Sequence, residues 1–498
     1  MIRIAGCFGL GLMIIAGCGE PPREDGEGLG SGIATNPSGG SATSDAPSTD
    51  GADADTTEGD DGIKLDIPEP GETDGVPDSG GGGGTCPPLP GTDATLTGTV
   101  YAPNQEIPVS GALVYVSDTP PDGIPQLVYC AECVELPCDV PYTLTEADGS
   151  FELPAYSGEG YLVVTKGQFM RVTEVDFTDG VNELSAEVTS LPDENVPSEG
   201  RYIPRIALAW GSYDRLEDAL GKLGLADTMI NGATFSEDFV PGTEQFDVWN
   251  NTTDLLGGGP ETESQGSFAT LLSNYPLMEQ YHIIFVPCSD DTALSALNDP
   301  AVIENVQRWV ENGGKFYVSD WSNEFVGQVF GQYQNFFTDG GSADLPNAYD
   351  SVATILDDDL NAWMDALPAG LKDINPLNGG AADFPVVENP PTIETVENWS
   401  GISATPPVLV DDGMGGQIDV GHKVWIEGPG DNDIIPGGNH PLTVTGEYGC
   451  GKVLFTTYHM AEFDDSYVGL TPQELVLLYL ILEIGVCQVP YDPPPPAG

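Results

Sequence analysis

The chain has 498 residues, 40% of them hydrophobic, so it is long enough for two or three domains with buried cores. Its 14 lysines and arginines face 79 aspartates and glutamates, which gives a formal net charge of −65. A field of this sign repels phosphate backbones, so we exclude nucleic acid as a partner. The acidic surface is expected to keep a secreted protein soluble, and no cofactor is predicted. The alternative role for the acidic side chains is calcium binding, although no run has the spacing of an EF-hand loop.

Residues 1–18 are predicted to be a leader. Arg3 precedes an apolar stretch too short to span a bilayer, and the stretch ends in Ile15-Ala16-Gly17-Cys18. This ending resembles the bacterial lipobox, which implies cleavage before Cys18 and lipidation of that residue. A plain signal peptide with a chance cysteine is the alternative. Lipidation implies a cell-envelope protein anchored in a membrane, in the first place the outer membrane, and facing the periplasm or the exterior.

Residues 19–85 are rich in Gly, Ser, Thr, Asp and Glu and contain almost no large apolar side chains. Such a segment cannot bury enough surface to offset the entropy lost on ordering, so we predict a disordered acidic stalk. The proline-rich tail at residues 488–498 is predicted to be unstructured for the same reason.

Residues 86–191 show short apolar alternations such as "GYLVVTKG", separated by turn residues. This period of two predicts a small antiparallel β-sandwich. The order of four segments resembles the carboxypeptidase regulatory-like domain: Gly98–Val100, Gly111–Val116, Thr145–Leu153 and Gly160–Val164. The resemblance implies a transthyretin-like sandwich without catalytic residues, which serves as a spacer or a binding module.

Four cysteines lie in or beside this module: Cys86, Cys130, Cys133 and Cys138. The leader places them outside the reducing cytosol, and their spacing lacks the second half of a standard zinc motif. We therefore expect them to form two disulfides with each other, with a zinc site as the alternative, and we leave the pairing open. Cys450 and Cys487 are further disulfide candidates in the second module.

Residues 204–487 alternate apolar strands with amphipathic helices. The strands are expected near residues 203–210, 281–288, 315–320 and 452–459, and the helices near 212–224, 267–280, 299–313 and 471–485. Asp299 and Pro300 mark the start of the third helix, and Thr471 and Glu474 form a capping box at the start of the last. The last helix is apolar almost all round, so it is expected to pack on the sheet. This order predicts a mostly parallel sheet covered on both faces, a Rossmann-like or flavodoxin-like three-layer α/β domain. Residues 331–421 interrupt the repeat and are predicted to be an insertion over the carboxyl edge of the sheet.

The sequences "VENGGKFYVSDW" and "GEYGCGKVLFTTYH", with the terminal helix, resemble the class I glutamine amidotransferase-like fold. In that family the nucleophilic cysteine stands in a glycine-flanked bend after the strand that follows the "NGG" turn. Here Asp320 and Trp321 take that place, so the resemblance implies that the nucleophile is missing. His459 ends the strand of the family's catalytic histidine, but Glu462 follows three residues on, where the family has a carboxylate two residues on. Together with the sandwich, this domain resembles lipoproteins of myxobacteria and their relatives, a resemblance that implies no activity.

Ligands of such sheets lie at the carboxyl ends of the strands. This rule predicts a binding pocket lined by Trp210, Ser289, Asp290, Asp320, Trp321 and His459. Trp321 beside carboxylates can stack on a sugar, although a place in the core is the more common role of a tryptophan. Cys288 is interpreted as structural, with pocket lining or nucleophilic catalysis as alternatives. The carboxylates at Asp290 and Asp291 raise the pKa of a nearby thiol, whereas nucleophilic catalysis needs it lowered.

These observations predict a non-catalytic binding or scaffolding protein of the cell envelope, whose ligand is a carbohydrate, a peptide or a protein partner. The rival hypothesis is a cysteine- or metal-dependent hydrolase with Cys288 and His459 as catalytic residues; no metal ligand set is predicted. An open cleft with the Cys288 sulfur in reach of His459 would favour the hydrolase. A sealed thiol would favour binding.

Overall fold

The computed structural model describes residues 62–64, 89–131, 135–211, 213–231, 236–252, 262–289, 292–372, 375–376, 387, 390–411, 416–430, 434–460 and 467–483. All of them belong to one compact unit, which begins at Asp61. The predictions for the leader, Cys18 and the tail lie outside the described residues, as do nearly all of the stalk and Cys86, Cys133 and Cys487. Within the described part of the chain, no helix has the length and apolar character needed to cross a bilayer.

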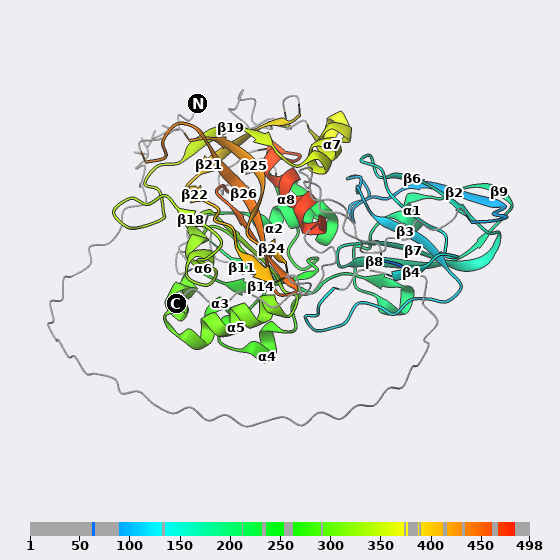
Figure 1. Ribbon diagram of the computed structural model, residues 1–498, viewed down its shortest axis with the longest axis horizontal. Helices are drawn as coiled ribbons and strands as arrows, with labels where there is room; N and C mark the ends of the chain where they lie inside the picture. The colour runs from blue at the N-terminus through cyan, green and yellow to red at the C-terminus, as the bar shows by residue number, and fades with distance from the viewer. Residues whose placement is uncertain are drawn as a thin grey trace, which may run out of the picture. The chain divides into compact units, whose positions relative to one another are not determined.

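The first module consists of a five-stranded and a three-stranded sheet that share one apolar core (Figure 1). The five-stranded sheet has the order β10 (Arg201–Tyr202), β8 (Phe169–Phe177), β7 (Gly158–Lys166), β3 (Leu113–Ser117), β5 (Tyr142–Leu144). The smaller sheet has the order β6 (Ser150–Ala155), β2 (Ala94–Thr99), β9 (Gly180–Glu183). Neighbouring strands are antiparallel except β2 and β9. Buried and exposed residues alternate along β6, the pattern that the sequence predicted.

The second module is built on a ten-stranded mixed sheet. Its first six strands are mutually parallel: β15 (Ser264–Ser267), β14 (Phe246–Asn250), β11 (Ile206–Trp210), β16 (Ile283–Val286), β17 (Lys315–Ser319) and β27 (Gly451–Thr456). Four antiparallel strands continue it: β26 (Asn439–Tyr448), β25 (Lys423–Pro429), β19 (Tyr349–Ile355) and β21 (Thr392–Asn398).

Two strands within the predicted insertion at residues 331–421, β19 and β21, extend the sheet itself. Strand β19 alternates buried and exposed residues. This pattern suits an antiparallel strand with one solvated face, whereas the parallel strands β11, β16 and β17 are buried throughout.

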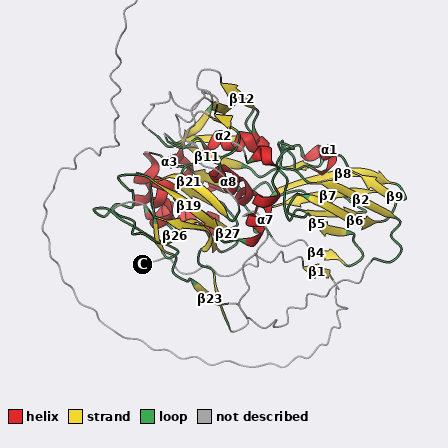
Figure 2. Ribbon diagram, turned by 90° about the horizontal axis from the view of Figure 1, so that it is seen from above, coloured by secondary structure: helices red, strands yellow, loops and turns green. Residues whose placement is uncertain are grey.

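Alternate residues of the parallel strands enter two separate cores, so the sheet is the middle of three layers (Figures 1 and 2). One core contains side chains of α2 (Leu216–Leu220), α7 (Asp358–Ala366) and α8 (Pro472–Glu483). The other contains side chains of α3 (Phe268–Leu272), α4 (Tyr275–Met278), α5 (Pro300–Glu311) and α6 (Glu324–Gly327). The helix expected at 267–280 is split into α3 and α4, with Ser273 and Asn274 between them.

Local sequence signals explain where the two longest helices begin. The Asp299 carboxylate accepts a hydrogen bond from the Ala301 N–H at the start of α5. At α8, the Thr471 hydroxyl and the Glu474 carboxylate exchange hydrogen bonds with each other's backbone N–H, which confirms the predicted capping box. Helix α8 is buried along its whole length up to Leu482, as its nearly uniform apolar sequence requires.

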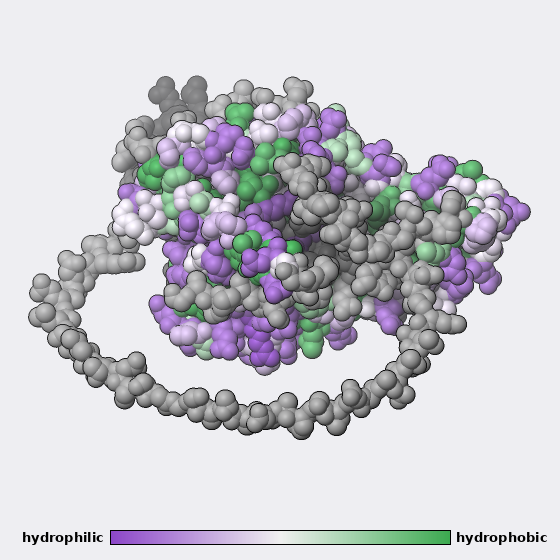
Figure 3. Space-filling view, viewed as in Figure 1, coloured by the Kyte–Doolittle hydropathy of each residue, from purple (hydrophilic) through white to green (hydrophobic). Residues whose placement is uncertain are grey.

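The two modules are joined through a continuous core. The Trp363 indole N–H of α7 donates to the Pro108 carbonyl of the sandwich at 2.7 Å. Lys166 at the end of β7 pairs with Glu483 at the end of α8 at 2.5 Å. Residues of both modules belong to the same apolar cluster. Hydrophilic side chains cover most of the described surface seen in Figure 3, in keeping with the acidic composition.

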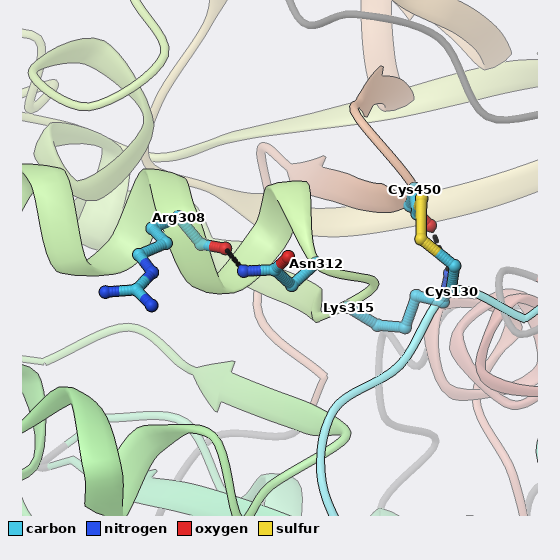
Figure 4. The surroundings of a disulfide bond; sticks show 5 residues. All are labelled: Cys130, Arg308, Asn312, Lys315 and Cys450. Atoms are coloured by element: carbon cyan, nitrogen blue, oxygen red, sulfur yellow. Dashed lines mark hydrogen bonds between the residues drawn. A yellow bond between two sulfur atoms is a disulfide. The ribbon is translucent and has the colours of Figure 1, made fainter.

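A disulfide between Cys130 and Cys450 also links the modules (Figure 4). Both residues are among the predicted disulfide cysteines, but the expectation that Cys130 pairs within its own module is wrong. The loop of Cys130 lies against the second module, where the Val128 N–H donates to the Glu279 carbonyl at 2.7 Å. Cys138 is disulfide-bonded as well. Of the four cysteines in the described residues, Cys288 alone is free.

Candidate functional site: a buried cysteine, aspartate and histidine

Three neighbouring parallel strands end at the same edge of the sheet and bring together three side chains far apart in sequence. Cys288 follows β16, Asp320 follows β17, and His459 follows β27. One ligand atom from each of these side chains lies within 4.8 Å of the other two. His459 Nε2 lies 3.5 Å from Asp320 Oδ2. We call these three residues the Cys–Asp–His cluster.

Asp320 occupies a strained bend. Its φ is +53°, and Gln105 and Glu397 are the other non-glycine residues with positive φ among the described residues. A left-handed conformation of a residue with a side chain costs of the order of 1–3 kcal/mol, so the surrounding contacts must hold it. The Ser322 hydroxyl donates to the Pro287 carbonyl at 2.8 Å, which ties the turn after β17 to the end of β16. The bend lies where the sequence predicted an elbow with an acid in place of a cysteine.

A second set of polar groups holds the three strand ends in register. The Cys288 N–H donates to the Ser319 hydroxyl at 3.0 Å, and that hydroxyl donates to Asp214 at 3.1 Å. The Met460 N–H donates to the same carboxylate at 3.2 Å. Sequence reasoning missed Asp214, although it follows β11 and the strand-end rule would have included it.

Helix α8 fixes the backbone of His459 from the other side. The Gln473 amide donates to the carbonyls of His459 and Val396, each at 2.9 Å. This contact also escaped the sequence analysis, which had assigned the start of this helix to capping alone.

The cluster is sealed from solvent. The exposed fractions of Cys288, Asp320 and His459 are 1%, 0% and 4%. Burial raises the pKa of the Cys288 thiol to about 12, with His459 lowering it and Asp320 raising it further. Burial also raises the pKa of Asp320 well above its usual range, with His459 opposing this rise and Asp214 adding to it. The thiol lies beside an imidazole, as a hydrolase would need, but it lacks the open cleft and the lowered pKa.

Two of the predicted pocket residues, Trp210 and Ser289, are buried. Trp210 is 9% exposed and directs its indole N–H to Glu217 in the core at 3.3 Å, and Ser289 is buried with its hydroxyl 3.3 Å from the Asn251 carbonyl. Asp290 and its neighbour Asp291 lie outside the described residues.

Among the predicted pocket residues that the structure describes, Trp321 alone is half-exposed. Its ring centroid lies 5.2 Å from that of Trp399 and 5.7 Å from that of Tyr213, and its indole N–H donates to the Trp399 carbonyl at 3.1 Å. All three rings are half-buried, and we call them the aromatic group. Sequence reasoning found Trp321 but missed Tyr213 and Trp399. Trp399 was missed because it lies in the segment assigned to the insertion.

A cleft of about 440 Å³ lies between the sandwich and the second module. Its lining includes five carboxylates: Glu106, Asp193, Glu194, Asp227 and Glu237. In the part of the chain that the structure describes, one group of three His, Cys, Asp or Glu side chains has ligand atoms close enough to hold a metal ion. That group is the Cys–Asp–His cluster. The cleft therefore gives no support to the calcium alternative.

Two solved structures show a distant likeness to this chain. No family model matches the chain. No curated protein matches it either. A ThuA-like protein from Bacteroides uniformis is similar to 55% of this chain over 89% of its own, with 12% identity and a TM-score of 0.27. A cytoplasmic protein from Salmonella typhimurium is similar to 56% of this chain over 98% of its own, with 13% identity and a TM-score of 0.25. Both TM-scores are too low to assign a fold or an activity to this chain.

Proposed function

We propose that the protein is a lipid-anchored, non-catalytic binding protein of the cell envelope. In this proposal the sandwich is a carboxypeptidase regulatory-like spacer, and the second module is a class I glutamine amidotransferase-like unit without its nucleophile. The single observation that carries the proposal is the acid at the bend: Asp320 stands there at φ +53°, and the sulfur of Cys288 comes from the neighbouring strand into a sealed space.

The buried thiol is poorly suited to attack a substrate. A nucleophilic cysteine needs a thiolate and access for the substrate, whereas Cys288 is 1% exposed and burial raises its pKa to about 12. The imidazole of His459 is nearby, which keeps the hydrolase as the second candidate function. That candidate requires the segments over the cluster to open.

The aromatic group is the place where we propose that a ligand binds. Tyr213, Trp321 and Trp399 are half-exposed at the carboxyl edge of the sheet, the edge at which ligands of open α/β sheets bind. Glu397 accepts a hydrogen bond from the Trp399 indole at 2.9 Å and adds a polar acceptor beside the rings. Flat apolar rings with polar neighbours suit the face of a sugar, so we propose a surface carbohydrate as the ligand.

A glycan array tests this proposal, followed by tryptophan fluorescence titration with the glycans that bind. We expect Trp321→Ala to weaken binding about tenfold, because the loss of one stacked ring removes about 1.4 kcal/mol. Tyr156→Ala is the matched control, since Tyr156 is an exposed aromatic residue of the sandwich. Unchanged affinity in Trp321→Ala, or no binding to any glycan, refutes a carbohydrate ligand at the aromatic group.

A mass measurement separates binding from hydrolysis. The native protein is incubated with an activated acyl ester, p-nitrophenyl acetate, and its intact mass is recorded. The binding proposal predicts no acyl adduct on Cys288. An adduct that disappears in both Cys288→Ser and His459→Gln would establish the hydrolase instead.

A further inference from the structure

We propose that the Cys–Asp–His cluster is a zinc site, in which Cys288 Sγ, one carboxylate oxygen of Asp320 and one ring nitrogen of His459 bind a single Zn²⁺. This inference is independent of the proposed function. A buried zinc ion would join the ends of β16, β17 and β27, three strands whose ligands are separated by 32 and 139 residues in sequence.

The geometry is close to what zinc requires. Zinc bonds to sulfur at about 2.3 Å and to nitrogen or oxygen at about 2.0–2.2 Å, so ligand atoms around a tetrahedral ion lie roughly 3.3–3.6 Å apart. His459 Nε2 and Asp320 Oδ2 are already 3.5 Å apart. The three ligand atoms are nowhere more than 4.8 Å apart, so a contraction of about 1 Å, within reach of side-chain rotation, completes the set. A water molecule would take the fourth position, as in sites with three protein ligands.

The surroundings of Asp320 suit a metal ligand. The residue is 0% exposed, and neither of its carboxylate oxygens has a hydrogen-bond partner of good geometry among the described residues. The Trp399 backbone N–H and the His459 imidazole lie beside the carboxylate, and both lower its pKa. A buried carboxylate with so few donors is costly, and a metal ion is one of the few groups that satisfies it. The left-handed φ of Asp320 directs a strained residue into the cluster, which is typical of functional positions.

The donor set selects zinc over the calcium considered from composition. Thiolate and imidazole are soft or borderline ligands that suit zinc, whereas calcium takes six to eight oxygen ligands. A thiolate, a carboxylate and a neutral imidazole carry two negative charges, so one Zn²⁺ makes the buried site neutral. This charge balance removes the main cost of burying Cys288 and Asp320 as anions side by side.

The backbone around the cluster is held as zinc ligands require. Ser319 connects the Cys288 N–H with Asp214, and Gln473 holds the His459 carbonyl. Such outer contacts orient the ligands of metal sites and lower the cost of ordering them.

Cobalt substitution tests the site, because Co²⁺ bound to thiolate gives a sulfur-to-metal charge-transfer band. The full-length protein is unfolded with its disulfides intact, refolded with one equivalent of Co²⁺, and kept in excess Mg²⁺ so that surface carboxylates are occupied. We expect the charge-transfer band and intense visible bands, displacement of Co²⁺ by one equivalent of Zn²⁺, and loss of the sulfur band in Cys288→Ser. Asp320→Asn and His459→Gln should weaken zinc binding at least about tenfold. His440→Gln is the matched control, since this histidine lies outside the cluster.

A second measurement keeps the test decisive if the variants fold poorly. Alkylation of Cys288 in the unmodified protein is followed in mild urea with and without Zn²⁺. Zinc bound to the thiol should slow the alkylation at least tenfold. Equal alkylation rates, absence of the sulfur-to-cobalt band, or a band that persists in Cys288→Ser overturns the zinc site. Acylation of Cys288 would refute the proposed function without bearing on these readouts.

Discussion

Lys315 is buried where a charge is costly, and its replacement by methionine should stabilise the protein in a pH-dependent way. The residue is 0% exposed in the middle of the sheet, and its amine donates to the Cys450 carbonyl at 3.3 Å beside the disulfide (Figure 4). Burial lowers its pKa from 10.5 to about 7. Lys452, its partner on β27, adds to this lowering, and Glu447 opposes it.

The direction in which stability changes with pH follows from the number of protons that each state binds. Between pH 7 and 10.5 the unfolded chain holds a proton on this lysine that the native protein lacks, so this group makes the free energy of unfolding rise with pH. Below pH 7 both states are protonated, and the cost of the buried charge is fully present. At about 1.36 kcal/mol per pKa unit, the gap between 10.5 and 7 corresponds to about 5 kcal/mol. The hydrogen bond lost in Lys315→Met offsets about 1 kcal/mol of this gain.

Urea unfolding of the unmodified protein and of Lys315→Met, followed by circular dichroism from pH 6 to pH 9.5, measures this effect. We expect the variant to be more stable by up to about 4 kcal/mol at pH 6 and the difference to shrink steadily above pH 7. Lys372→Met is the control, because Lys372 lies nearer the surface and donates to the carbonyls of Met364 and Asp365. A constant difference between the two proteins across this pH range would refute the reasoning.

Three further changes test the contacts between segments. Replacing Cys130 and Cys450 by serine opens a loop of 320 residues and should cost up to about 5 kcal/mol by loop entropy, seen as a lower urea midpoint under non-reducing conditions; an unchanged midpoint contradicts this. Lys222→Met leaves the buried Glu474 unpaired and should cost about 3–5 kcal/mol, and Glu474→Gln in the same chain should recover most of it, as a double-mutant cycle measures. Gly313→Ala should lower the melting temperature by several degrees, because Gly313 has φ +108° and an added Cβ would lie 1.9 Å from a backbone oxygen of the Cys130 loop; a melting temperature within 1 °C of the original, about the error of the measurement, contradicts it.

The sequence was most informative where one physical signal dominated. Period-two alternation predicted the sandwich, and Asp299 with Pro300 marked the start of α5. Uniformly apolar strands predicted a sheet covered on both faces, and α8 is buried as its composition demanded. Each of these signals is local, so tertiary contacts had little opportunity to override it.

Long-range pairing could not be predicted from the sequence. Cys130 and Cys450 are far apart in the chain, and no local feature shows that the loop of Cys130 lies against the turn between β26 and β27. The same holds for β19 and β21, whose place beside β25 depends on register with distant strands. Trp399 at the carboxyl edge was missed for this reason.

Cys288, Asp320 and His459 show that a position at a strand end does not reveal how exposed a side chain is. The rule that functional groups lie at strand ends identified Cys288, Asp320 and His459, but it does not say whether that edge is open. Burial weighs against a nucleophile, because an attacking thiol needs both access and a thiolate. A metal ligand needs neither, since the ion itself stabilises the thiolate and is bound as the chain closes around it. The low exposure that argues against catalysis is therefore compatible with a zinc site, and the reactivity of one thiol distinguishes the two roles.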